Sequence, residues 1–182
     1  MTSFERVDTE VQWEGMFIRA GVERFRYDDG IVVTREKVWH PGAVGILAID
    51  DEHVWLTRQP REAVGAQASL EIPAGKLDVP GESPLETGNR ELAEEIGKQA
   101  ASWEELFAFY TSPGFSDERV WIYLATELSD SGPAAGDEDE RIEIVPWELS
   151  RLDDAIAECE DSKSLIALLW LAARGRSAAP AE

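Results

Sequence analysis

The chain has 182 residues, of which 43% are hydrophobic and seven are tryptophan, so its composition argues against disorder and suits a single compact domain. It carries 37 acidic residues against 17 basic ones, a formal charge of -20. A polyanion approaching this surface would meet net repulsion, and we therefore expect no nucleic-acid partner.

Three expectations follow from features of the whole chain. The single cysteine, Cys159, excludes an intrachain disulfide, and we expect it to be an ordinary helix residue. The N-terminus lacks a basic start followed by an apolar run, which favours a cytoplasmic location. The longest apolar stretch, residues 165–173, is too short to span about 30 Å of hydrocarbon as a helix, so we expect no membrane role.

The first 40 residues predict an antiparallel β-hairpin. Residues 16–27 and 31–39 are rich in β-branched and aromatic side chains, and they meet at Asp28-Asp29-Gly30, a turn sequence typical of hairpins. We divide the chain into this hairpin region (1–40), a main domain (41–174) and a small polar tail (175–182) that we expect to be disordered.

The main domain alternates strands and helices irregularly. Strands are predicted at residues 44–49, 54–57, 70–72, 106–111, 119–128 and 141–145, and helices at 84–96, 152–160 and 164–173. Because this order is not a repeating βα unit, it predicts an α/β fold in which helices cover both faces of a mixed β-sheet, that is, an α/β/α sandwich.

Residues 75–97 are the most informative segment, because they join a glycine turn to a capped helix rich in carboxylates. Ser83 and Glu86 stand at the spacing of a capping box, Pro84 occupies the favoured first helical position, and Gly97 closes the far end. The helix boundaries can therefore be read from the sequence.

The acidic residues of this helix lie beside its apolar face. Leu92 and Ile96 share a stripe that can face a core, and Glu91, Glu94 and Glu95 fall on a neighbouring arc. Like charges at this spacing repel by a few tenths of a kcal/mol per pair, and a divalent cation such as magnesium, which prefers oxygen ligands, removes that repulsion. A solvated acidic helix face is the alternative, and the commoner reading of a bare Glu-Glu pair.

The helix residues stand at fixed offsets from the turn that precedes them. The set comprises Gly75, Glu82, Arg90, Glu91, Glu94, Glu95 and Gly97, with Leu92 in the apolar slot. This pattern resembles the signature of the Nudix hydrolases. There are two departures: six residues rather than five separate Gly75 from Glu82, and Lys98 occupies the last apolar position. The register from Glu82 onward is intact, so the extra residue can be absorbed as a longer turn.

A second segment narrows the resemblance. Pro113 lies sixteen residues beyond Gly97, and residues 113–118 read Pro-Gly-Phe-Ser-Asp-Glu. This is similar to the ADP-ribose pyrophosphatase branch of the Nudix hydrolases, particularly to its actinobacterial members. The alternative is that Pro113-Gly114 is simply a turn.

The resemblance implies magnesium-dependent hydrolysis of the diphosphate bond of ADP-ribose to AMP and ribose 5-phosphate, with manganese able to substitute. Another nucleotide sugar or a dinucleotide as substrate stays open, as does a non-catalytic nucleotide-binding sensor. The resemblance also implies a homodimer in which the N-terminal sheet crosses to the partner, although packing of this sheet on its own domain is the simpler alternative. Adenine binding calls for an aromatic face, and none of four N-terminal candidates can be singled out: Trp13, Phe17, Phe25 and Tyr27.

The resemblance also assigns the metal ligands and their support. Metal contacts fall to Glu91 and Glu95, to Glu94 in some members, and to the main-chain carbonyl of Ala74. Arg90 can bridge back to Glu82 and fix the turn that starts at Gly75 against the helix.

The remaining site residues lie outside the helix. In the segment Gln59-Pro60-Arg61, the resemblance assigns Arg61 to the substrate phosphate or terminal ribose. Arg35 is a further candidate, with a surface salt bridge as its alternative. Hydrolysis also needs a base that accepts the proton of the attacking water. The resemblance places this base on the loop before residue 141, where Glu138 comes first and Glu140 second, and Glu94 is a further catalytic candidate. The alternative is that the acidic run at 137–140 is a solvated loop tip.

Overall fold

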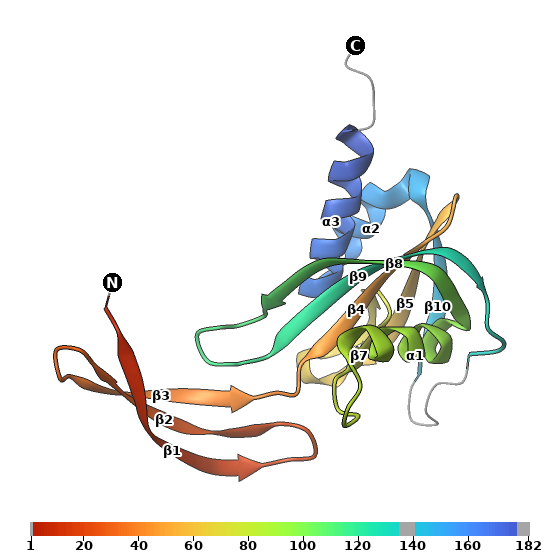
Figure 1. The fold of residues 1–182 in the computed structure, drawn as a ribbon. Helices are drawn as coiled ribbons and strands as arrows, with labels where there is room; N and C mark the ends of the chain where they lie inside the picture. The colour runs from red at the N-terminus through yellow and green to blue at the C-terminus, as the bar shows by residue number, and fades with distance from the viewer. Residues whose placement is uncertain (1, 135–140, 178–182) are drawn as a thin grey trace.

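Two β-sheets organise the chain (Figure 1), whose computed structural model describes residues 2–134 and 141–177. The smaller sheet consists of β1 (Phe4–Glu14), β2 (Arg19–Tyr27) and β3 (Val32–Trp39). The larger one consists of β4 (Ala43–Ile49), β5 (His53–Arg61), β6 (Ala66–Glu71), β7 (Ala74–Lys76), β8 (Lys98–Tyr110), β9 (Arg119–Asp130) and β10 (Glu143–Glu148). The helices are α1 (Pro84–Ile96), α2 (Leu152–Glu158) and α3 (Ser162–Ser177), with single turns η1 (Glu62–Val64) and η2 (Leu149–Arg151).

The larger sheet is mixed, as predicted. Its strands follow the order β10-β5-β4-β9-β8, with β6 paired to β5 and β7 paired to β4. Strands β4 and β9 run parallel, whereas β4 with β5 and β8 with β9 run antiparallel.

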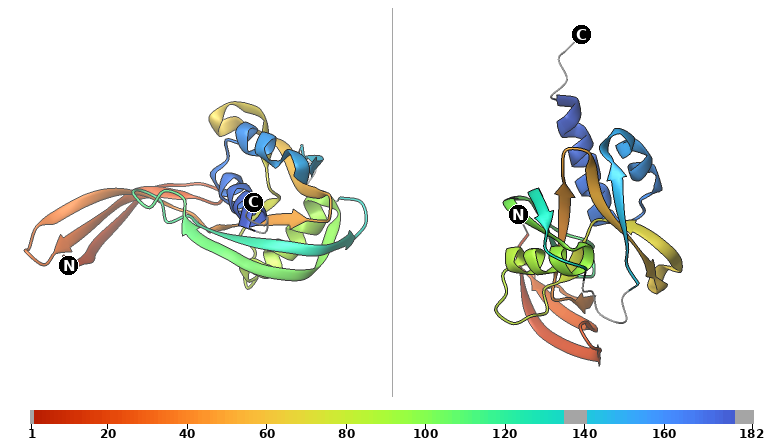
Figure 2. Two further views of the ribbon diagram at one scale, coloured as in Figure 1. Left: turned by 90° about the horizontal axis from the view of Figure 1, so that it is seen from above. Right: turned by 90° about the vertical axis from the view of Figure 1, so that its right-hand side faces the viewer.

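Strand β4 lies in the middle of the sandwich and is buried on both faces. Ile46 and Ala48 pack in a cluster with Leu92 of α1, whereas Leu47 belongs to a second cluster that includes Leu168 of α3. This alternation follows from the two-residue period of a strand. Helix α1 accordingly covers one face and helices α2 and α3 cover the other (Figures 1 and 2), which confirms the α/β/α sandwich.

Helix α1 begins and ends where the sequence predicts. The Ser83 side chain accepts a hydrogen bond from the Glu86 amide at 3.3 Å, and the Glu86 carboxylate accepts one from the Ser83 amide at 2.8 Å. Gly97 ends the helix in the left-handed conformation, with φ of 65°. These caps fix the register of the glutamates on the helix.

The N-terminal region contains one strand more than the hairpin that the sequence predicts. Strands β2 and β3 form that hairpin, and β1 pairs with β2. All of β1 is exposed, and bulges between Arg6 and Asp8 and between Val11 and Trp13 interrupt the alternation that marks a strand. Residues 16–18, which we expected to begin a strand, lie in the β1–β2 turn, where the Gly15 amide donates to the Ile18 carbonyl at 2.9 Å.

Several strand boundaries differ from the prediction. Strand β8 starts at Lys98 rather than at residue 106, β5 continues to Arg61, and β10 spans 143–148 rather than 141–145. Among the strands of the described residues, β8 and β10 are the two ends of the sheet order, so each pairs with a neighbour on one side. Edge strands tolerate polar residues and proline, so their hydrophobic pattern is weak.

The C-terminal helices also correct two expectations. Helix α2 ends at Glu158, so Cys159 is not a helix residue. It is a buried residue after the helix, and its thiol donates to the Leu70 carbonyl at 3.3 Å. Helix α3 continues to Ser177, so the segment expected to be a disordered tail begins inside a helix. Within the part of the chain that the structure describes, no helix combines the length and apolar character needed to cross a bilayer.

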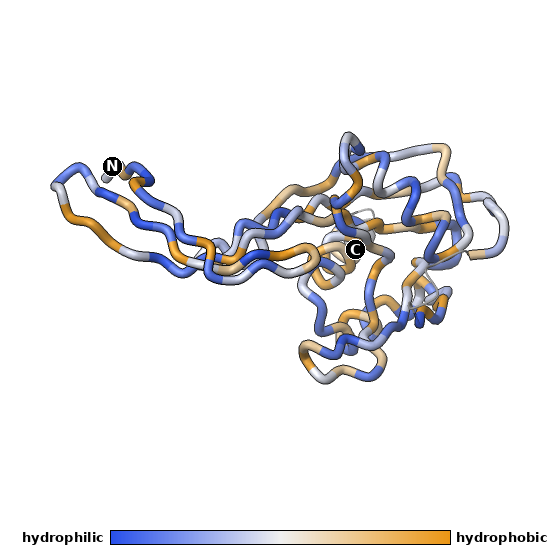
Figure 3. The backbone as a smooth tube through the Cα atoms, turned by 90° about the horizontal axis from the view of Figure 1, so that it is seen from below, coloured by the Kyte–Doolittle hydropathy of each residue, from blue (hydrophilic) through white to orange (hydrophobic). Residues whose placement is uncertain are grey.

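The N-terminal sheet projects from the sandwich like an arm (Figures 1 and 2). Its base is tied to the 112–118 segment, because the Val38 amide donates to the Phe115 carbonyl at 2.8 Å and Lys37 pairs with Asp117 at 3.1 Å. Figure 3 shows apolar segments along the arm. Its exposed large apolar residues include Phe4, Val7, Val11, Trp13, Ile31 and Val32.

Candidate functional site

A cavity of about 650 Å³ lies where β5, β7, α1 and the start of α3 meet, a size common for small-molecule sites. Its charged and amide-bearing lining residues include Gln59, Arg61, Lys76, Glu91, Glu95, Glu118, Asp161 and Lys163. Main-chain segments of Ala74 and Gly75 complete this part of the wall.

Two of the three helix glutamates face this cavity and meet at β7. Glu95 is 4% exposed, and its Oε2 atom accepts a hydrogen bond from the Ala74 amide at 3.0 Å. Glu91 lies directly against Gly75, where an added Cβ would stand 2.0 Å from its Oε1 atom. The helical spacing of Glu91 and Glu95 therefore brings two carboxylates onto one short stretch of backbone.

Arg90 links the turn before α1 to the helix itself. Its guanidinium lies 3.3 Å from Glu82, 2.9 Å from Glu91 and 2.8 Å from Glu94. Burial would lower the pKa of Arg90, but the hydrogen bonds and charges of these carboxylates raise it. Glu94 is thus turned toward Arg90 and is not among the residues that line the cavity.

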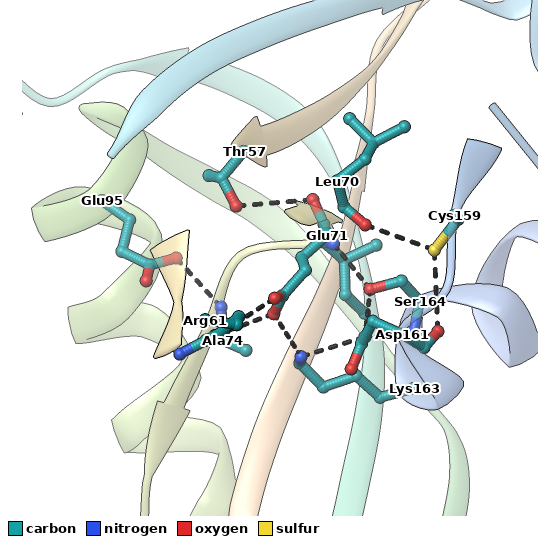
Figure 4. Close-up of polar contacts among 11 residues, drawn as sticks. Thr57, Arg61, Leu70, Glu71, Ala74, Glu95, Cys159, Asp161, Lys163 and Ser164 are labelled. Atoms are coloured by element: carbon teal, nitrogen blue, oxygen red, sulfur yellow. Dashed lines mark hydrogen bonds and ion pairs between the residues drawn. The ribbon is translucent and has the colours of Figure 1, made fainter. Parts of the chain in front are cut away.

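A buried carboxylate joins Arg61 to a lysine of α3 (Figure 4). Glu71 is 2% exposed and accepts two hydrogen bonds from Arg61, at 2.7 and 2.8 Å, and one from Lys163 at 2.6 Å. Burial would raise the pKa of Glu71, but the hydrogen bonds and charges of both cations lower it to about 2. Glu71 therefore stays ionised at neutral pH and holds both cations at the cavity wall.

The sequence analysis missed several residues that line this cavity. Lys163 is one of them, and it lies 92 positions from Glu71, a separation at which no spacing rule applies. Glu118 is another, and it accepts a hydrogen bond from the Thr111 hydroxyl at 2.6 Å. Its signal was its place at the end of the 113–118 motif. His40 also lines the cavity, with its Nδ1 atom 3.7 Å from Glu118.

The structure does not bring Arg35 to this cavity. Its guanidinium donates to the neighbouring Thr34 carbonyl at 3.0 Å, and it lines a second cavity of about 680 Å³ between the N-terminal sheet and residues 110–117. Two of the aromatic candidates, Phe25 and Tyr27, line this second cavity, whereas Phe17 lines the first. Glu138 and Glu140 lie outside the described residues.

The residues present fit a hard divalent cation through oxygen ligands. Within residues 2–134 and 141–177, no three His, Cys, Asp or Glu side chains stand together as a ready metal-binding group. The carboxylates of Glu91 and Glu95 do, however, converge on the Ala74-Gly75 backbone at the cavity. Two carboxylates, main-chain oxygen and open positions for water are the donor set that magnesium accepts.

Known proteins resemble the chain over most of its length. Residues 39–169 match the family model described as NUDIX domain. The chain is 41% identical over 145 residues to the ADP-ribose pyrophosphatase of Mycobacterium tuberculosis, which covers 79% of this chain and 70% of that protein. It is 38% identical over 169 residues to the methanol dehydrogenase activator of Bacillus methanolicus, covering 91% of this chain and 90% of that one.

A solved structure described as an ADP compounds hydrolase has the same fold. It superimposes with a TM-score of 0.80 at 26% identity, and the match covers 95% of this chain and 96% of the other. The likeness therefore extends beyond the matched domain to nearly the whole chain.

Proposed function

The chain belongs to the Nudix family, and on this premise we propose that it hydrolyses the diphosphate bond of ADP-ribose to AMP and ribose 5-phosphate, with magnesium as cofactor. The observation that carries the proposal is one cavity of about 650 Å³ lined by two carboxylates, Glu91 and Glu95, and two cations, Arg61 and Lys163. The names of the M. tuberculosis relative and of the solved structure both support a substrate that contains ADP.

The carboxylates of Glu91 and Glu95 would hold the metal, together with the main-chain carbonyl of Ala74, and Glu94 is a further ligand that would first have to leave Arg90. When bound, the ion would lower the pKa of a water ligand and offset the charge of the diphosphate. Nudix hydrolases generally use divalent cations, and the oxygen ligands here favour magnesium, with manganese as a substitute.

The chain's own residues would position the substrate and move the proton. Water forms a new bond to one phosphorus as the bond from that phosphorus to the bridging oxygen breaks, and the water proton passes to a carboxylate. We assign this base to Glu138 first, then to Glu140 or Glu94. Arg61 would bind phosphate oxygens as a bidentate donor, and Arg35 would reach the substrate from the second cavity.

The support of the metal site would come from the turn before α1. Arg90 and Glu82 hold this turn against the helix, and Gly75 leaves room for the Glu91 carboxylate. The residue added between Gly75 and Glu82 lies in the turn and leaves these contacts in place. The longer turn is therefore compatible with an active enzyme.

We further propose a homodimer built through the N-terminal sheet. Every residue of β1 is exposed, and Phe4 and Trp13 are 63% and 54% exposed. A three-stranded sheet that projects from the sandwich buries little apolar area of its own, and a second copy of the chain would cover it.

Product analysis with a substrate panel tests the proposed reaction. The purified chain is incubated with ADP-ribose, GDP-mannose or NAD in magnesium, with EDTA as the control. We expect ADP-ribose to be cleaved fastest, to equal amounts of AMP and ribose 5-phosphate, with no cleavage in EDTA and recovery on adding excess magnesium. If GDP-mannose or NAD were cleaved faster, that compound would be the preferred substrate instead of ADP-ribose, and the protein would still be a diphosphate hydrolase.

The B. methanolicus relative favours a second candidate function, because its name describes an activator of another enzyme. A nucleotide-binding sensor would bind ADP-ribose in a saturable way and would release no AMP from it. The same incubation, combined with a binding measurement, separates this function from hydrolysis.

A further inference from the structure

The Arg61–Glu71–Lys163 cluster presents two cations to the cavity from different elements. Arg61 ends β5, Lys163 lies in the first turn of α3, and Glu71 ends β6. In Figure 4 the two cations approach the Glu71 carboxylate from different sides. Both cations line the same cavity as Glu91 and Glu95.

The contacts with Glu71 and Asp161 occupy only part of the N–H donors of these two cations. A lysine ammonium has three N–H donors, and Lys163 directs them at Glu71 at 2.6 Å and Asp161 at 3.0 Å. Arg61 has five donors and gives one from Nε and one from Nη2 to Glu71. Beyond these contacts Arg61 has three further N–H donors and Lys163 has one, and both side chains lie at a cavity wall.

Gln59 is a further polar residue of this wall. It lines the same cavity, and its buried Nε2 atom has no hydrogen-bond partner in the described part of the chain. A buried donor without an acceptor destabilises the fold. The wall of the cavity therefore contains an amide donor whose hydrogen bond the described part of the chain does not satisfy.

The shared carboxylate explains how a flexible lysine can act as a fixed contact. Lys163 is 13% exposed at its side chain, and its ammonium is held by Glu71 and Asp161 before any ligand arrives. Groups already fixed in place lose less conformational entropy on binding. With Asp161 the cluster holds two cations and two carboxylates, so its formal charge is zero, and the N–H donors of Arg61 and Lys163 are what it can offer to an anion.

We propose that Lys163 binds phosphate oxygens of the substrate alongside Arg61, and that Glu71 is a positioning residue that holds both cations for this task. The proposal deepens the proposed function and rests on it for the identity of the substrate. Its test does not depend on turnover.

Binding of α,β-methylene-ADP, whose bridging carbon resists hydrolysis, tests the role of Lys163 by calorimetry in magnesium. We expect Lys163→Met to raise the dissociation constant at least about 10-fold, the loss of one charge-assisted hydrogen bond. Lys163→Arg should recover most of the affinity. With the best substrate of the panel, Lys163→Met should raise KM more than it lowers kcat.

Lys98→Met is the matched control, because Lys98 is 18% exposed and also pairs with a carboxylate, Asp130, at 2.6 Å, on a different surface. It should leave the dissociation constant unchanged. Unchanged analogue binding by Lys163→Met, with or without a lower melting temperature, would reduce Lys163 to a structural role and overturn the proposal. An absence of analogue binding by the unaltered chain would overturn it as well.

A double variant tests whether Glu71 acts through Lys163. Glu71→Gln should weaken analogue binding, and adding Lys163→Met to it should weaken binding much less than the 10-fold expected in the unaltered background. If the effects of the two substitutions on the binding free energy were fully additive, Glu71 would not act through Lys163.

Failure of the proposed function is recognised separately. If the chain binds the analogue through Lys163 but does not cleave ADP-ribose, the proposed substrate is wrong and the proposed role of Lys163 stands. If the chain cleaves ADP-ribose but Lys163→Met does not change analogue binding, the proposed substrate stands and the proposed role of Lys163 is wrong.

Discussion

The Oε1 atom of Glu91 occupies the space beside Gly75 so closely that a Cβ at Gly75 would stand 2.0 Å from it. Gly75 is not among the glycines with positive φ, so alanine fits its backbone without strain. The Glu91 side chain must move instead, because its Cγ atom would also stand 2.3 Å from this Cβ. Displacing a proposed metal ligand by about 1 Å lowers turnover about 100-fold. We therefore expect Gly75→Ala to fold normally and to lose about that factor in kcat/KM, measured with ADP-ribose in magnesium.

Gly88→Ala is the control for this substitution. Gly88 lies on the same helix, and an added Cβ would meet nothing nearer than Val44 at 3.5 Å. Alanine should stabilise the helix by up to about 1 kcal/mol and leave turnover intact. Equal turnover by Gly75→Ala and Gly88→Ala would contradict the placement of Glu91 at the reaction centre.

Arg90 offers a test of the contacts that support the proposed metal site. Arg90→Met leaves Glu82, Glu91 and Glu94 without the cation that joins them. A hydrogen bond to a charged group contributes about 1.5–3 kcal/mol to the free energy of unfolding. We expect urea unfolding to show a loss of about 2 kcal/mol. Arg90→Lys should recover only part of it, because an ammonium cannot form the planar fork. An unchanged midpoint would show that the turn needs no such link.

The stability of the protein should depend on pH through Glu71. Its pKa is about 2 in the folded chain against an ordinary 4.5, so the ionised form stabilises the fold above pH 4.5, and this contribution disappears as the pH falls from 4.5 toward 2. The shift corresponds to about 3 kcal/mol. Glu71→Gln should be less stable at pH 7 and should lose less stability than the unaltered chain between pH 4.5 and 3.

Denaturant unfolding at several pH values measures this difference. Glu104→Gln is the control, because Glu104 is 59% exposed at its side chain and pairs loosely with an equally exposed Arg174, at 3.7 Å. It should follow the unaltered chain at every pH. If Glu71→Gln also did so, the buried carboxylate would not be the group that titrates.

The homodimer can be tested by charging the exposed sheet. Trp13→Asp places a carboxylate in the apolar surface of β1, and we expect the dimer to dissociate to monomers in sedimentation velocity. Val64→Asp alters another exposed apolar residue, which lies in η1 and is 80% exposed, and it should leave the dimer intact. A monomeric unaltered chain at micromolar concentration would rule out the dimer.

Short-range sequence signals made helix α1 predictable, whereas contacts between segments distant in the chain could not be predicted from the sequence. Ser83 and Gly97 mark the ends of α1 by short-range rules, so the positions of its glutamates follow from the sequence. Strand β1 was not predicted because two bulges interrupt the alternation of its side chains and because none of its residues is buried. The pairing of Glu71 with Lys163 depends on β6 and α3 meeting in the fold, which neither segment encodes alone.

The most direct test of the central claim is the magnesium-dependent turnover of ADP-ribose by Glu95→Gln. A glutamine can still accept the hydrogen bond from the Ala74 amide, so the variant should fold and melt like the unaltered chain. The account predicts that kcat falls by about 100-fold or more, as expected when a group that acts in the transition state is lost. Turnover equal to that of the unaltered chain, still abolished by EDTA, would contradict it.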